Sequence, residues 1–284
     1  MRVNLHGADA LFLTALGGAL ALALGAAPLG VLLIGRRMSL VGDSLSHATL
    51  PGAAIAYLLA GSDPWAMTFG ALVAGVLVAS AAAILSRYAR MPEDAAFAVL
   101  YLTALALGVL ILGRAGSAEL VHALLFGDSR ALDGVGLVLA VTAACATVLA
   151  FMTLGRRLER AAAEGAGEAH GWSGAAQALL MGLVAANLVA GFRAFGALMT
   201  VGLMMIPAAA AQFWSTGFTG RVIAAVMISA AASAGGLLAA RALQVEPGPA
   251  MILSAALLFT LSLIFGQARS LSTRPRKAHL AAHD

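Results

Sequence analysis

The sequence predicts an all-α polytopic integral membrane protein with about nine, or at the fewest eight, transmembrane helices. Of the 284 residues, 61% are hydrophobic and 11% are charged, whereas soluble domains are about 45–50% apolar and about 25% charged. Several apolar stretches reach the ~20 residues with which a helix crosses the bilayer. Alanine, leucine, glycine and valine fill these stretches without alternating with polar residues, which disfavours a β-barrel.

The apolar runs end at clusters of arginine, glycine, proline and aspartate. The nine predicted spans are 10–34, 40–60, 66–86, 95–113, 131–154, 172–192, 194–214, 222–242 and 250–267. The first span is predicted to be a retained helix, because its apolar run is longer than the about 7–15 residues of a usual signal peptide. The division beside Arg193 is the weakest one, and merging spans there would give eight.

Basic residues concentrate on one side of a nine-span chain, which the positive-inside pattern identifies as the cytoplasm. This side holds Arg36, Arg37, Arg87, Arg90, Arg156, Arg157, Arg160, Arg221, Arg269, Arg274, Arg276 and Lys277. The N-terminus is then expected outside and the C-terminus inside. The formal net charge of +4 follows from this pattern, so we expect no nucleic-acid partner.

No segment is long enough to form a separate soluble domain. We therefore expect a single transmembrane domain over residues 1–284, with spans over about 10–267. A cytoplasmic loop at 155–171 and a cytoplasmic tail at 268–284 are its longest polar stretches.

Missing motifs exclude several kinds of chemistry. Cys145 is the single cysteine, so no intrachain disulfide can form, and we expect it to be a small core residue. Lys277 is the single lysine and follows no glycine-rich loop, so the chain is not itself a Walker-type ATPase. His-Glu-x-x-His and Gly-x-Ser-x-Gly are also missing, and we expect no enzyme activity.

Two ionisable side chains inside the second span, Asp43 and His47, are the most informative residues of the chain. A charged group in hydrocarbon costs several kcal/mol unless it is paired or faces water. Four positions apart, the two residues share one face of a helix. Measured from Arg37 along a straight helix, Asp43 would lie about 9 Å and His47 about 15 Å deep. An imidazole nitrogen and a carboxylate oxygen so placed can bind one divalent transition metal ion.

Two side chains supply only half of a metal site, so other interpretations stay open. The pair could satisfy itself and lock two helices together, or it could relay protons. Glu119 and His122 form a second candidate pair at i and i+3, where a solvated surface pair is the favoured interpretation. The residues from Gly42 to Leu45 also resemble the nucleophile motif of GDSL esterases, but that serine requires a soluble α/β fold.

The segment from Arg36 to Gly52, RRMSLVGDSLSHATLPG, resembles the signature of the zinc/manganese/iron branch of ABC importer permeases. Three more stretches follow in the order of that family, and the resemblance extends over about residues 10–265. These stretches are PEDAA at 92–96, LFGD at 125–128 and VGLMMIPAAAA at 201–211.

The resemblance implies a multi-pass permease of the cell inner (plasma) membrane, with a fold similar to that of the cobalamin and siderophore importers. It implies a second permease copy or a paralogue, cytoplasmic ATPase subunits and an extracytoplasmic metal-binding protein as partners, within the lipid bilayer. Asp43 and His47 match the family's metal-pathway residues and become the predicted ligands. The expected ligand is the transported divalent metal (Zn, Mn or Fe), with no cofactor bound permanently.

Members of this family contact their ATPases through a short cytoplasmic helix with an acidic residue, then alanine, then glycine. The loosely matching residues here are Glu159, Ala162 or Ala163, and Gly165 or Gly167, and a merely solvated linker is the alternative. A secondary, proton-coupled metal transporter would also use a midplane Asp/His pair, but this loop would be superfluous to it. A non-transporting membrane assembly subunit would need neither residue of the pair.

Pro207 lies in the middle of the seventh span. A mid-span proline removes one backbone hydrogen bond and clashes with the preceding turn, so we expect a break that serves gating. A tolerated kink is the alternative. The run from Ala208 to Ala211 would let another helix approach closely and slide.

Overall fold

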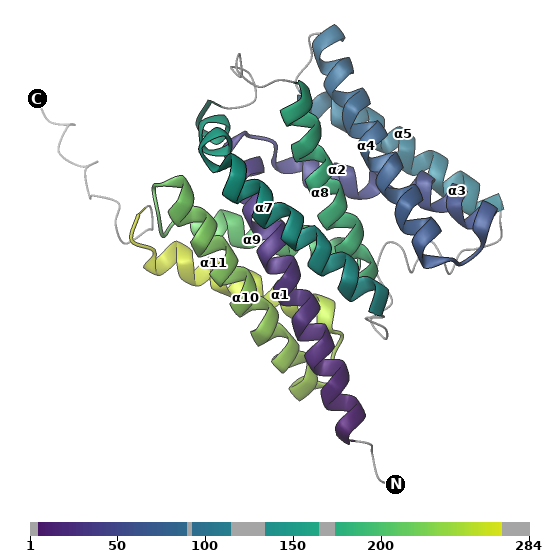
Figure 1. The fold of residues 1–284 in the computed structure, drawn as a ribbon. Coiled ribbons are helices and arrows are strands. Elements are labelled where there is room, and N and C mark those ends of the chain that lie inside the picture. The colour runs from purple at the N-terminus through teal and green to yellow at the C-terminus, as the bar shows by residue number, and fades with distance from the viewer. Residues whose placement is uncertain (1–4, 90–92, 115–133, 165–173, 269–284) are drawn as a thin grey trace, which may run out of the picture.

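The computed structural model describes residues 5–89, 93–114, 134–164 and 174–268, and all regular secondary structure within these ranges is α-helical (Figure 1). The helices are α1 (Leu5–Gly35), α2 (Ser39–Ala48), α3 (Leu50–Ala60), α4 (Pro64–Ala89), α5 (Glu93–Arg114), α7 (Gly134–Glu164), α8 (Gly174–Phe195), α9 (Ala197–Ala211), α10 (Phe218–Leu243) and α11 (Pro247–Phe265).

Within the described ranges, six helices are long and apolar enough to cross a membrane. Their apolar parts are Phe12–Gly35, Pro64–Ser86, Ala95–Leu112, Gly134–Arg160, Phe218–Leu243 and Pro247–Phe265. Shorter apolar helices cover Ala178–Phe192 and Met199–Ala211. The predicted polytopic all-α class is therefore confirmed, whereas the number of nine spans stays a prediction.

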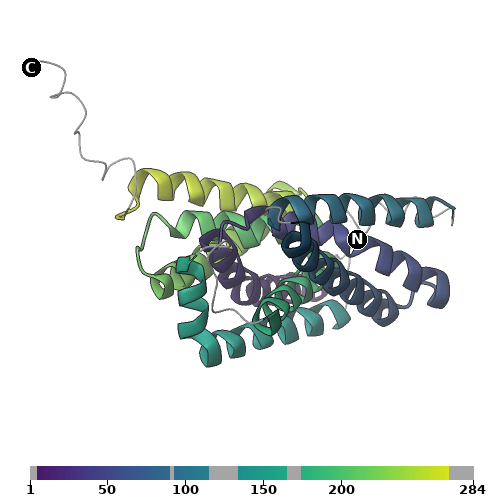
Figure 2. The same cartoon turned by 90° about the horizontal axis from the view of Figure 1, so that it is seen from above.

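Helix α1 forms the centre of the molecule. It packs against α7, α8, α9 and α10, and seen from above it lies between α7 and α11, which occupy opposite edges (Figure 2). In its most apolar window 78% of the residues are buried, against at most 33% in the other five long helices. Helices α3, α4 and α5 pack against one another on one side, and α8 connects them to the α1 group.

The predicted second span is two helices, because α2 ends at Ala48 and α3 begins at Leu50. Pro51 accounts for the division: it has no N–H to donate, and its ring would clash with the carbonyl of His47 four residues earlier. The His47 carbonyl instead accepts from the N–H of Thr49. Proline is well tolerated in the first turn of a helix, where Pro51 now lies.

The depths predicted for Asp43 and His47 presuppose one straight helix that continues from Arg37, and α2 begins only at Ser39. Arg37 lies in the turn between α1 and α2 with a φ of 59°. Helix α2 crosses behind α8 instead of running parallel to it (Figure 1).

The prediction for Cys145 was wrong, because its side chain is exposed on the surface of α7. The buried face of this helix carries Ala140, Ala144 and Thr147, and Cys145 follows Ala144 on a different face. An apolar run does not indicate which face is buried when the surrounding solvent is itself apolar.

Candidate functional site

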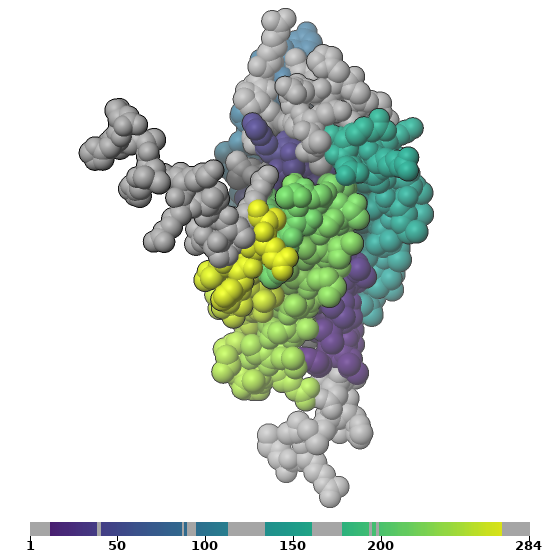
Figure 3. Space-filling view, turned by 90° about the vertical axis from the view of Figure 1, so that its left-hand side faces the viewer, coloured from purple at the N-terminus to yellow at the C-terminus, as the bar shows by residue number. Residues whose placement is uncertain are grey.

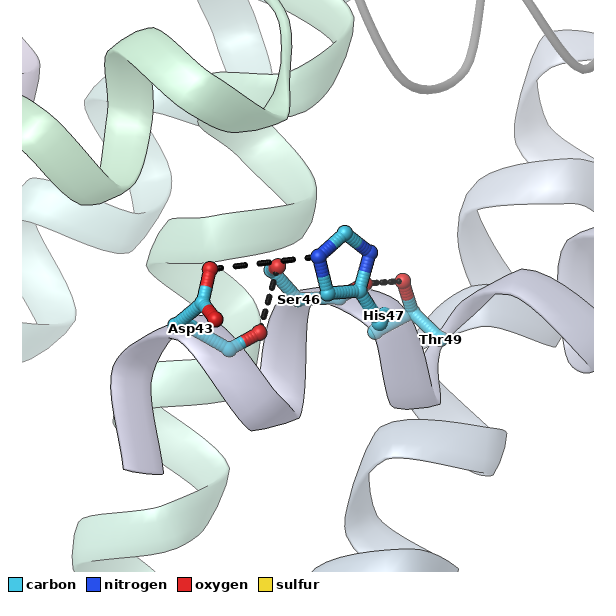
Figure 4. A network of polar contacts seen from close by, with 4 residues as sticks. All are labelled: Asp43, Ser46, His47 and Thr49. Carbon is cyan, nitrogen blue, oxygen red and sulfur yellow. Dashed lines mark hydrogen bonds and ion pairs between the residues drawn. The ribbon is translucent and has the colours of Figure 1, made fainter. Parts of the chain in front are cut away.

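Asp43 and His47 lie one turn apart on α2, with 3.8 Å between Oδ1 of the carboxylate and Nε2 of the imidazole (Figure 4). The side chain of His47 is 27% exposed and that of Asp43 is 59% exposed. A hydrogen bond between such groups would be about 2.7–3.2 Å long, so the pair is not closed on itself. Both residues belong to one helix, so the pair does not lock two helices together.

The distance between these two atoms fits a shared ion. If an ion lay about 2.1 Å from each atom, the angle between the two ligand atoms at the ion would be roughly 130°. A distorted transition-metal site tolerates such an angle. Groups of three or more histidine, cysteine or acidic side chains suited to a metal are missing from the described residues. One copy of the described chain therefore offers a pair of ligands and leaves the other coordination positions open.

The imidazole of His47 is held by packing. It stacks on the ring of Tyr101 from α5, with 6.1 Å between ring centroids and 29° between the planes. Its Nδ1 is buried, and among the described residues it has no hydrogen-bond partner. Resident metal sites almost always fix a ligating histidine through a hydrogen bond to the other ring nitrogen. The arrangement here suits an ion that is held briefly.

Two hydroxyl groups at the end of α2, those of Ser46 and Thr49, bind backbone carbonyls of the same segment. Ser46 donates to the carbonyl of Asp43 at 2.6 Å, and Thr49 donates to the carbonyl of Ser46 at 2.8 Å. Both side chains are buried. These two hydroxyl groups are therefore engaged inside the protein, whereas the carboxylate of Asp43 and the imidazole of His47 are partly exposed.

Gly42, next to Asp43, brings α2 directly against α9. A Cβ at this position would lie 2.5 Å from the Cε of Met204 and 2.8 Å from the Cε of Met205. The methyl groups of two methionines thus occupy the space that any other residue would need. The helix that carries the Asp/His pair consequently rests on the helix that carries Pro207.

Pro207 lies inside α9, which continues as one helix to Ala211. The predicted break is thus not seen, and the gating role of this proline stays a prediction. Because Pro207 has no N–H, the carbonyl of Leu203 loses its helical donor, and the hydroxyl of Ser229 from α10 donates to it at 3.4 Å. A Cβ at Gly30 of α1 would collide with the carbonyl of Met204, so α9 is supported from two sides at this turn.

The residues predicted to couple to an ATPase are only partly described. Glu159 is exposed in the C-terminal part of α7, and Ala163 lies in the last turn of the same helix. Gly165 and Gly167 lie outside the described residues, as do Glu119 and His122. The first part of the predicted loop at 155–171 is thus a continuation of α7.

Two polar or aromatic residues that the sequence analysis did not single out have specific partners, one at the Asp43–His47 site and one elsewhere in the helix bundle. Tyr101 supports His47 from α5, a helix distant in sequence, and no local pattern signals such a contact. Asn187 of α8 is buried, and its amide donates to the hydroxyl of Thr147 and to the carbonyl of Leu183, both at 2.9 Å. An asparagine inside an apolar span was the available signal, because such a group requires a partner in the membrane.

The comparisons with known proteins agree with one another. The model of the ABC 3 transport family matches residues 8–266. The chain is 27% identical over 272 residues to the manganese transport system membrane protein MntC of Bacillus subtilis (strain 168), a match that covers 91% of this chain and 62% of that protein. The chain thus spans less than two thirds of this relative.

Other relatives are matched over most of their length. The manganese import system permease protein ScaB of Streptococcus parasanguinis is 26% identical over 273 residues, with 93% of this chain and 92% of that protein covered. A probable iron transport system membrane protein of Haemophilus influenzae is 27% identical, with 84% of each covered. The fold resembles a chain of PsaBC from Streptococcus pneumoniae in complex with Fab, with a TM-score of 0.75, 26% identity, and 90% and 92% coverage.

Proposed function

The chain belongs to the ABC 3 transport family, and we propose that it is the membrane-spanning permease subunit of an ATP-driven importer. The proposed cargo is a divalent transition metal ion, such as zinc or manganese. The chain is a multi-pass protein of the plasma membrane and a transport permease rather than an enzyme. The observation that carries the proposed cargo is the Asp43–His47 pair, whose 3.8 Å gap suits one ion between an oxygen and a nitrogen donor.

The proposed site holds the ion transiently. Two protein ligands leave several positions for water or for further donors, and incomplete coordination lets the ion leave again. If two permease copies pair about one axis, the second copy supplies another aspartate and another histidine. A heterodimer with a paralogue would provide the same type of pair only if that paralogue carries the motif.

The relatives named above work in manganese or iron transport systems, which supports these two ions as the first cargoes to test. Carboxylate and imidazole also bind zinc, so zinc belongs in the same experiment as a competitor.

The proposed partners follow from the family. ATP hydrolysis is assigned to separate cytoplasmic subunits, which would dock at the end of α7 and the segment after it, with Glu159, Ala163, Gly165 and Gly167 as contact residues. An extracytoplasmic metal-binding protein would deliver the ion from the other side. Membership of the ABC 3 family favours this mechanism over a proton-coupled secondary transporter.

Uptake of radioactive manganese by proteoliposomes that contain the permease with its ATPase and its metal-binding protein tests the proposal. We expect uptake to require ATP on the ATPase side and to persist when the proton gradient is dissipated. Excess unlabelled zinc or iron, added separately, ranks the three ions. Uptake driven by a proton gradient without ATP would establish the secondary transporter instead.

A further inference from the structure

A cavity of about 890 Å³ lies between the cytoplasmic half of α7 and the start of α10, with α1 as its floor. Both outer helices pack closely on α1 but scarcely touch each other. On the face seen in Figure 3, α7 (teal) and α10 (green) flank α1 (purple). The cavity is therefore a groove formed where two helices diverge over a third, and neither the Asp43–His47 pair nor Pro207 contributes to it.

The lining changes from apolar to basic along the groove. Leu24, Phe151 and Val226 represent the part within the membrane, where the walls are mainly hydrocarbon. At the cytoplasmic end the lining includes three arginines and one glutamate, all exposed, which leaves a surplus of positive charge. These four residues are Arg156, Arg157, Glu159 and Arg160.

The start of α10 adds positive potential at the same end. Phe218 and Thr219, the first two residues of this helix, line the cavity. The N-cap Gly217 provides no side-chain cap, and the first turn contains no acidic residue. The N-terminus of a helix carries unpaired N–H groups and a positive dipole end, which favour an anion.

The length of the groove matches one leaflet of a bilayer. Its lining on α7 runs from Thr147 to Arg160, which is about 20 Å at 1.5 Å per residue. The hydrocarbon core of a bilayer is about 30 Å thick, so one leaflet contributes about 15 Å. The groove thus reaches from the headgroup layer on the cytoplasmic side to near the middle of the membrane.

We propose that this groove binds one anionic phospholipid of the cytoplasmic leaflet, with an acyl chain between α7 and α10 and the phosphate group against Arg156, Arg157 and Arg160. Guanidinium groups bind phosphate oxygens in a bidentate manner, and basic pockets between transmembrane helices suit anionic headgroups. A soluble anion would use only the basic end and would leave the apolar part empty. Lipid binding here is independent of which ion the permease carries.

The test compares the retention of two lipids by the purified full chain in mild detergent, measured by native mass spectrometry. The lipids are dioleoylphosphatidylglycerol (PG) and dioleoylphosphatidylcholine (PC), which differ in net charge and share their acyl chains. We expect the wild type to retain PG in preference to PC. Each arginine lost beside an anionic lipid weakens binding about fivefold, so R156Q/R157Q/R160Q should retain both lipids equally.

Two further variants separate the parts of the site. R37Q removes a cytoplasmic charge that does not line the groove and should keep the preference for PG. Val148 lines the groove, and V148W fills its apolar part while all arginines remain. We expect V148W to lose bound PG as the triple arginine variant does.

Three outcomes would overturn the proposal. An unchanged PG preference in R156Q/R157Q/R160Q would show that the arginines do not hold the headgroup. Displacement of PG by glycerol 3-phosphate, together with wild-type retention in V148W, would identify a site for a soluble anion. Loss of ATPase association in the triple variant with unaltered PG retention would identify a protein-docking surface.

Discussion

At the scale of single residues, Asp43 and His47 differ in what holds them. The imidazole of His47 stacks on Tyr101, whereas the carboxylate of Asp43 is more exposed and lies beside Nε2 (Figure 4). A packed nitrogen donor beside a more exposed carboxylate fits the transient ion site proposed above. For metal uptake, the negative charge should matter at position 43, and the nitrogen donor should matter at position 47.

We predict that Asp43→Ala and His47→Ala each lower metal uptake by at least about tenfold, the lower end of what disturbing a metal-ligand environment costs. Asp43→Asn should be nearly as damaging, because it keeps the shape and removes the charge. Membrane insertion should be unaffected, since removing an intramembrane polar group does not hinder it. Uptake of radioactive manganese per inserted protein is the measurement.

Glu246→Gln is the matched control for the carboxylate, because Glu246 is exposed at the start of α11 and makes no side-chain cap hydrogen bond. It should keep wild-type uptake. Wild-type uptake by both Asp43→Ala and His47→Ala would instead end the ligand hypothesis and favour a non-transporting subunit.

At the scale of helices, the two intramembrane prolines near the site have different consequences. Pro51 divides the predicted second span, whereas Pro207 is accommodated within α9 by the hydroxyl of Ser229. Membrane helices tolerate proline where a neighbouring helix supplies the missing donor. The sequence alone does not predict which of the two prolines divides a helix, because the donor for the Leu203 carbonyl comes from a residue on another helix.

We predict that Pro207→Ala slows uptake at saturating metal and leaves the half-saturating metal concentration nearly unchanged. The new N–H can bind the carbonyl of Leu203 within α9, so the contact with Ser229 is no longer needed and α9 loses its dependence on α10. Uptake rates over a range of manganese concentrations measure both quantities. Unaltered kinetics would reduce Pro207 to a packing role.

Ser229→Ala should destabilise the protein by about 1–3 kcal/mol, because it leaves the buried Leu203 carbonyl without a donor. Adding Pro207→Ala to this variant should restore most of the loss, since the backbone then supplies the donor. The unfolding temperature in detergent is the measurement. Ser80→Ala on the exposed face of α4 is the control and should have little effect, and no recovery in the double variant would contradict the explanation.

Pro51→Ala should reduce uptake without reducing the amount of inserted protein. Without the proline ring, the chain from α2 to α3 can form one continuous helix, which would turn His47 away from Tyr101. Pro64→Ala, at the first position of α4, is the control, because a proline there only starts a helix. Wild-type uptake by Pro51→Ala would show that the division does not depend on this residue.

At the scale of the whole molecule, the helical class and most helix positions were predictable, because the thickness of the bilayer fixes the length of an apolar run. Which face of each helix is buried could not be predicted. Cys145 was expected in the core and is exposed, since lipid-facing and buried surfaces are equally apolar. The spacing of Asp43 and His47 was visible in the sequence. The contact between His47 and Tyr101 was not, because it depends on how α2 and α5 pack in three dimensions.

We predict that the purified chain alone hydrolyses no ATP and that its partner ATPase supplies the activity, because the sequence contains no phosphate-binding loop. ATPase activity that stays with the isolated chain after repurification would refute this. Deleting residues 161–167 should uncouple ATP hydrolysis from transport. This deletion begins after Leu158, which is buried in the core, so it tests coupling without removing a core residue.

The central position of α1 has a consequence for how the chain is made. This helix leaves the ribosome before α2 to α11, yet α7 to α10, which bury it, are synthesised only after α2 to α5. During translation the alanine- and glycine-rich surface of α1 therefore stays exposed to lipid until α7 to α10 have been inserted. A nascent chain halted after α5 should consequently be a target for membrane quality-control proteases, whereas one halted after α10 should persist.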